Sequence, residues 1–169
     1  LAALSPSCAW RAQVGLPEGG EERSDIFEER LSRAAELKEE ATLRLKAQDF
    51  VAAKQLYRRA FHHADYSELE HMQFAVHHSQ MIYDAQIPIL LNLAQTTLKR
   101  SELGNATGPA RSDKQLRACV AYCTAALKLE ATCVKALYRR ALARERSGDC
   151  EEAVPDLRAA LKILQTQED

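Results

Sequence analysis

Apolar residues recur along most of the chain at intervals of three to five residues, which is the spacing of a helix with one buried face. The stretch 24–48 shows it over the greatest length, through Ile26, Leu31, Ala34, Leu37, Ala41 and Leu45. The same period continues in 51–64, 88–100, 114–130 and 134–164. The pattern predicts an all-α chain made of successive helices.

Residues with helix-start and turn chemistry divide these stretches. Ser24 and Asp25 stand before the first one, and Asp25 with Glu28 predicts a capping box there. Pro88 suits the first turn of a helix, where a missing N–H is harmless. Gly148 and Asp149 predict a turn between the last two helices.

Small residues recur at a fixed spacing in three places. In chain order the three sets are Ala41, Ala53, Ala60; Ala94, Cys119, Ala126; and Ala141, Ala153, Ala160. The first and last sets have the same intervals, 12 residues and then 7 residues. The middle set has the same second interval of 7 residues, but its first interval is 13 residues longer. Small side chains at fixed offsets mark close helix contacts. A unit of about 34 residues built from such helix pairs is the tetratricopeptide repeat. The sequence predicts three repeats in a short right-handed α-solenoid.

The expected organisation is a flexible leader, 1–23, followed by a repeat domain, 24–169. The repeats are placed at 34–67, 87–133 and 134–167. An insertion at 68–86 holds neither glycine nor proline, so it is expected to extend the second helix or to add a helical turn. A second insertion, 101–113, holds two glycines and a proline and is expected to form an exposed, mobile loop.

Composition narrows the class of partner. The formal net charge is -1, which gives no reason to expect a nucleic-acid partner. No apolar run approaches the roughly 20 residues of a membrane span, so no membrane partner is expected. Five cysteines are an odd number, and Cys119 and Cys123 lie one helical turn apart, which favours small buried side chains in a reducing cytoplasm over a disulfide framework.

Catalytic and metal chemistry find little support. His62–His63 and His77–His78 are neighbours in sequence, and adjacent helical residues point about 100° apart, so neither pair is arranged to chelate a metal. The sequon at Asn105 has meaning only in a secreted chain. There is no phosphate-binding glycine loop and no recognisable nucleophile. We therefore expect no enzyme activity, no metal and no cofactor.

Polar residues on the first helix of each repeat carry the functional prediction. These helices line the concave face of a solenoid, where polar side chains have little structural purpose. Lys38 and Thr42 lie one turn apart in the first repeat, Asn92 lies in the second, and Lys135 and Arg139 lie one turn apart in the third. These five residues form the candidate site.

The spacing resembles that of the carboxylate-clamp tetratricopeptide modules of co-chaperones. Their pattern is Lys and Asn four apart, then one Asn, then Lys and Arg four apart, so Thr42 is the one departure among five positions. The stretches QIPILLNLAQTTLK and VKALYRRALAR are similar to parts of immunophilin co-chaperones and aryl-hydrocarbon-receptor-interacting proteins. The resemblance covers about residues 30–164. It implies binding of the acidic C-terminal tail of a ninety- or seventy-kilodalton heat-shock chaperone in the cytoplasm.

The side-chain chemistry of these residues also supports carboxylate binding without the resemblance. Lysines can neutralise the two carboxylates of a terminal aspartate, Arg139 can offer a forked donor, and Asn92 a neutral one. A second hypothesis remains open, in which the groove binds an internal peptide or helix and needs no free carboxylate. Thr42 and both insertions favour it, because they alter the edge of the groove. Loss of binding on amidation of the peptide separates the two hypotheses.

The last helix raises a separate expectation. Leu157, Leu161 and Leu164 have the spacing of a buried stripe, although no later helix follows in this sequence to cover them. We expect the stripe to be covered by self-association or by the leader docking through Trp10.

Overall fold

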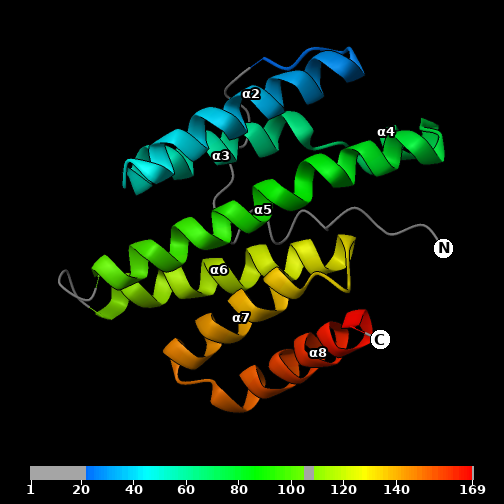
Figure 1. Cartoon of the computed structure of the whole chain (residues 1–169). Coiled ribbons are helices and arrows are strands. Elements are labelled where there is room, and N and C mark those ends of the chain that lie inside the picture. Colours follow the sequence, from blue (N-terminus) through cyan, green and yellow to red (C-terminus); the bar gives the residue numbers. More distant parts are fainter. Residues whose placement is uncertain (1–21, 105–108, 169) are drawn as a thin grey trace.

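The computed structural model describes residues 22–104 and 109–168, and these residues form seven helices and no strand. With the labels of Figure 1, the helices are α2 (Phe27–Lys46), α3 (Phe50–Ala64), α4 (Glu68–Gln73), α5 (Val76–Gly104), α6 (Pro109–Leu129), α7 (Val134–Ser147) and α8 (Cys150–Glu168). The prediction of an all-α chain is confirmed. Most of the expected leader, including Trp10, lies outside the described residues.

The helices stack as antiparallel pairs into a short α-solenoid (Figure 1). The pairs are α2 with α3, α5 with α6, and α7 with α8, and successive pairs meet through α3 and α5 and through α6 and α7. The first helices of the pairs also touch, since α5 contacts both α2 and α7. One layer of the solenoid is therefore formed by α2, α5 and α7.

The small residues with the repeated spacing lie where the helices meet. All nine are at most 6% exposed, and the six in the first two sets are fully buried. A larger side chain at any of them would have to displace a neighbouring helix, since protein interiors are close-packed. These positions are therefore the close helix contacts that the spacing predicted.

The first insertion, 68–86, is helical as expected, but its helix belongs to the next repeat. The second helix of the first repeat ends at Ala64, and the insertion forms α4 and the first turns of α5. Pro88 consequently lies inside α5, so its expected place in a first turn was wrong. The preceding turns are held by packing: Ile82 is fully buried, and Gln86 donates from Nε2 to the Ala64 carbonyl at 2.8 Å. These contacts stabilise the turns of α5 before Pro88, although proline has no backbone N–H to donate within the helix.

The second insertion, 101–113, contradicts the expected long loop. Its first four residues complete α5 and its last five begin α6, so only 105–108 fall outside the described residues. Ser101 and Ser112 are 3% and 8% exposed, which is the burial of a packed helix end. Pro109 is the first residue of α6, a position where the missing N–H costs nothing.

The capping box expected at Asp25 and Glu28 does not form. Helix α2 begins at Phe27, so its N-cap is Ile26, which has no side-chain cap, and Asp25 lies one residue too early. Ser24 instead accepts a hydrogen bond from the Ile26 N–H at 3.1 Å and donates to Glu29 at 2.5 Å.

Helix α4 is attached to the first repeat by Arg30, a nearly buried residue of α2. Arg30 donates to Glu70 of α4 at 2.6 Å and to the His63 carbonyl at 3.2 Å, and its guanidinium stacks 3.7 Å from the Tyr66 ring centre. Ser67 and Glu70 cap α4 reciprocally. Burial of the Glu70 carboxyl acts to raise its pKa, but the hydrogen bonds from Ser67 and Arg30 and the charge of Arg30 outweigh it, so the pKa lies below its ordinary value.

The cysteines in the described part of the chain are all free thiols. Cys119, Cys123 and Cys133 are buried, as expected of small apolar residues, whereas Cys150 at the start of α8 is exposed.

No helix within 22–104 or 109–168 has the length and apolar character needed to cross a membrane.

Candidate peptide-binding groove

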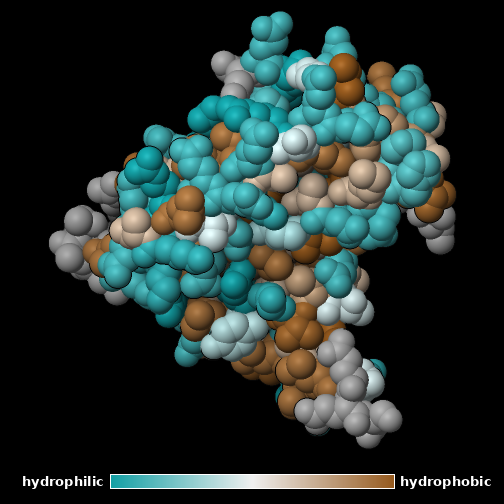
Figure 2. Space-filling view, turned by 45° about the horizontal axis from the view of Figure 1, so that its top comes forward, coloured by the Kyte–Doolittle hydropathy of each residue, from teal (hydrophilic) through white to brown (hydrophobic). Residues whose placement is uncertain are grey.

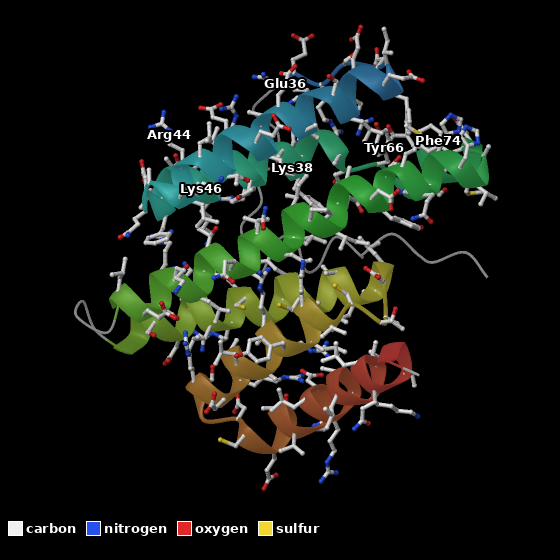
Figure 3. The ribbon with its side chains drawn as sticks, in the orientation of Figure 1. Glu36, Lys38, Arg44, Lys46, Tyr66 and Phe74 are labelled. Carbon is white, nitrogen blue, oxygen red and sulfur yellow. The ribbon has the colours of Figure 1, made fainter. Side chains whose placement is uncertain are left out.

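The five candidate residues lie on the three helices that share one layer. Lys38 and Thr42 are on α2, Asn92 is on α5, and Lys135 and Arg139 are on α7. Lys135 is exposed and the other four are half-buried, so each has some surface for a ligand. Figure 3 shows Lys38 in the space between α2 and α5.

Tyr57 of α3 joins the candidate residues of α2 and α5. Its hydroxyl lies 2.9 Å from the Thr42 hydroxyl, and it also hydrogen-bonds the Asn92 side chain. Thr42 donates its own proton to the Lys38 carbonyl at 2.8 Å, so Tyr57 must donate to Thr42. Asn92 in turn donates to the phenol oxygen. Burial raises the pKa of Tyr57 above its ordinary value, and these hydrogen bonds offset that only in part, so the phenol stays protonated and able to donate.

These hydrogen bonds determine which N–H and O–H donors of Thr42 and Asn92 remain for a ligand. The Thr42 proton is used within α2, on the carbonyl one turn earlier, a bond that threonine readily forms in a helix. Asn92 has two N–H donors, of which one serves Tyr57, so the second is left for a ligand. Thr42 therefore supplies no proton to the groove, whereas Asn92 can supply one.

Arg139 joins α7 to α5 in a similar way. Its Nη1 donates to the Leu91 carbonyl at 2.7 Å, which brings the guanidinium beside the residue that precedes Asn92. A guanidinium carries five N–H donors, so this single bond fixes the side chain and leaves most of the fork for a ligand. The Arg139 guanidinium is thus fixed against α5 with donors to spare.

The contacts link the candidate residues into one band across α2, α5 and α7. Thr42 and Asn92 meet through Tyr57, while Arg139 reaches the backbone next to Asn92. The structure does not bring Lys38 and Lys135 together; each lies one helical turn before its neighbour in the band. The band therefore has hydrogen-bond donors on α5 and α7 and one lysine on each of α2 and α7.

Sequence reasoning missed two residues of this region. Tyr57 fitted the apolar stripe of α3 and gave no separate signal, since its partners lie 15 and 35 residues away in the chain. Tyr138 stands next to Arg139 on α7 and is 55% exposed, which is unusual for a large aromatic side chain. Its position between Lys135 and Arg139 in sequence was the available signal.

Two hollows in the described surface lie apart from the band. One, of about 350 Å³, lies between the ends of α5 and α7 and is lined by residues that include Glu102 and Arg146, which form an ion pair at 3.0 Å. The other, of about 410 Å³, lies at the start of α2 and includes Arg33 and Glu36, also paired at 3.0 Å. Neither of these two hollows is lined by a candidate residue.

Comparison with known proteins supports the fold. The chain is similar to a solved structure, the C-terminal TPR-containing domain of a Plasmodium falciparum protein described as an FK506-binding protein. The two share 23% sequence identity, the match covers 85% of this chain and 89% of the other, and the TM-score is 0.64. No protein-family model matches the chain, and no curated protein matches its sequence. The protein has the tetratricopeptide-repeat fold.

Proposed function

We propose that the protein is a non-enzymatic cytoplasmic adaptor whose groove binds the acidic C-terminal tail of a heat-shock chaperone. The observation that carries the proposal is the band itself, in which Arg139 is held on α5 by the carbonyl of Leu91, the residue before Asn92. A terminal aspartate presents two carboxylates, and the band offers a fixed guanidinium, an amide N–H and two lysines for them. The similar solved structure supports the fold alone and gives no information about the ligand.

The proposal is tested with a short peptide ending in Glu-Glu-Val-Asp. By fluorescence anisotropy, the free-acid peptide should bind in the micromolar range, about 7–8 kcal/mol. The same peptide with an amidated C-terminus should bind at least tenfold more weakly, because it lacks one of the two clustered carboxylates. Equal binding of both forms would instead support a groove that takes an internal peptide.

Thr42→Asn is expected to tighten binding of the free-acid peptide. An asparagine carbonyl oxygen can accept from Tyr57, as the Thr42 hydroxyl does now, while its amide N–H reaches the ligand. One added hydrogen bond to a charged group contributes about 1.5–3 kcal/mol, or roughly tenfold or more in affinity. Isothermal titration calorimetry measures the change.

Thr42→Val is the matched control, since it removes the hydroxyl without adding a donor. It should not tighten binding. If Thr42→Asn binds no better than Thr42→Val, the carboxylate does not lie over this part of the band.

A further inference from the structure

An exposed apolar stripe runs along α8, in the layer opposite the groove. Val154, Leu157, Leu161 and Leu164 are 43%, 45%, 57% and 46% exposed. With 3.6 residues per turn they fall within an arc of about 80° and extend over about 15 Å of the helix. Figure 2 shows hydrophobic side chains gathered at the lower end of the molecule, where α7 and α8 lie. The stripe adjoins the buried face of α8, which holds Ala153, Asp156 and Ala160.

The spacing of the stripe has a property that limits what can cover it. Its intervals are three, four and three residues, so it has the same spacing from either end of the helix. When two identical helices pair antiparallel about a two-fold axis at position 159, Val154 lies opposite Leu164 of the second copy. Leu157 then lies opposite Leu161 of the second copy, and no apolar residue of the stripe is left unmatched. A two-fold interface requires such self-complementarity, whereas an unrelated partner does not.

We propose that the protein forms a homodimer in which two copies of α8 pair antiparallel through this stripe. The interface leaves the band on α2, α5 and α7 open, because those helices form the other layer. Each dimer then presents two grooves, and a partner carrying two tails would bind both with increased avidity. The proposal is independent of which peptide the groove binds.

The charges beside the stripe give the dimer a characteristic salt dependence. Arg158 and Lys162 are exposed and lie on the adjoining face of α8, near position 159. The two-fold axis brings them close to their own copies, so like charges face each other across the interface. Salt screens this repulsion and also favours apolar burial, so dimerisation should strengthen with ionic strength. Four side chains per copy form a smaller contact than the roughly 800 Å² per partner of standard interfaces, so the dimer should be weak.

Sedimentation equilibrium of the whole chain over about 10 μM to 1 mM, in low and high salt, tests the proposal. The wild type should show a monomer–dimer equilibrium that shifts towards dimer in high salt. Leu157→Gln with Leu161→Gln should raise the dimer dissociation constant at least tenfold. The control is Leu69→Gln with Met72→Gln on α4, two apolar residues that are 72% and 82% exposed and lie outside the stripe. A control that weakens the dimer as much as the α8 variant would overturn the proposal.

Cysteine cross-linking tests the pairing itself, in a background that carries Cys8→Ser and Cys150→Ser. A Leu157→Cys chain mixed with a Leu161→Cys chain should form a disulfide-linked heterodimer under mild oxidation. Val154→Cys mixed with Leu157→Cys is the mismatched control, because those positions lie about 10 Å apart along the paired helices. Equal cross-linking in both mixtures, or a wild type that stays monomeric at every concentration, overturns the proposal.

Discussion

Lys135→Ala combined with Arg139→Ala is expected to weaken binding of the free-acid tail peptide by about 30-fold or more. The two side chains supply the cationic donors of α7, and Arg139 is fixed in place by its bond to the Leu91 carbonyl. Removing one partner of a desolvated, hydrogen-bonded charge pair costs about 2–5 kcal/mol. Isothermal titration calorimetry at low salt, with the fold verified by circular dichroism, measures the effect.

Two further variants separate loss of the ligand contact from loss of structure. Lys135→Ala alone changes an exposed side chain, so it should weaken binding while leaving the unfolding free energy unchanged. Lys114→Ala with Arg117→Ala removes the same charge from exposed positions on α6, outside the groove layer, and should leave affinity nearly unchanged. If the α6 variant loses as much affinity as the α7 variant, only net charge matters and the clamp geometry is wrong.

Asp156→Asn is expected to lower the free energy of unfolding by about 3 kcal/mol or more. The Asp156 carboxylate, 4% exposed, accepts two hydrogen bonds from Arg140 at 2.8 and 2.6 Å and one from Arg144 at 2.7 Å. Those bonds raise the pKa of the Arg140 guanidinium above its ordinary value. An amide in place of the carboxylate leaves two half-buried guanidinium groups without their counter-charge. Urea unfolding followed by circular dichroism gives the change.

A double variant and a control show whether loss of the Asp156 charge causes the expected loss of stability. Asp156→Leu with Arg140→Met removes both partners of the ion pair. This double variant should lose less free energy of unfolding than Asp156→Leu alone, because it leaves no Arg140 charge without its carboxylate. Glu152→Gln changes a carboxylate that is 68% exposed and pairs with Arg144 at 3.3 Å. Exposed ion pairs contribute about 0–1 kcal/mol, so this control should change stability little. A control loss equal to that of Asp156→Asn would contradict the explanation.

The network around Asp156 also connects stability to the groove. Arg140 additionally donates to the Thr124 hydroxyl at 3.2 Å, so it ties α7 to both α6 and α8. Arg139 is the next residue on α7, and its direction depends on how that helix is seated. A loosened network should therefore reduce peptide affinity even though none of its members lies in the band.

Some expectations were wrong because local signals compete with packing. Pro88 looked like a helix start, yet burial of Ile82 and the bond from Gln86 to the Ala64 carbonyl hold the turns before it in the helix. Asp25 looked like a cap, yet the helix begins two residues later. Neither outcome could be derived from the neighbouring residues alone, because each depends on where α2 and α5 meet the rest of the chain.

The sequence by itself determined the repeat fold and which helix faces meet. The spacing of the small residues encodes close helix contacts, because only small side chains let two backbones approach, and this requirement is local and periodic. The same periodicity placed Lys38, Asn92 and Arg139 on the three helices that share a layer. Only the tertiary structure decided that Tyr57 links Thr42 to Asn92 and that Arg139 reaches a carbonyl 48 residues away. Such bonds depend on the packing of separate helices, which residue spacing within one helix does not specify.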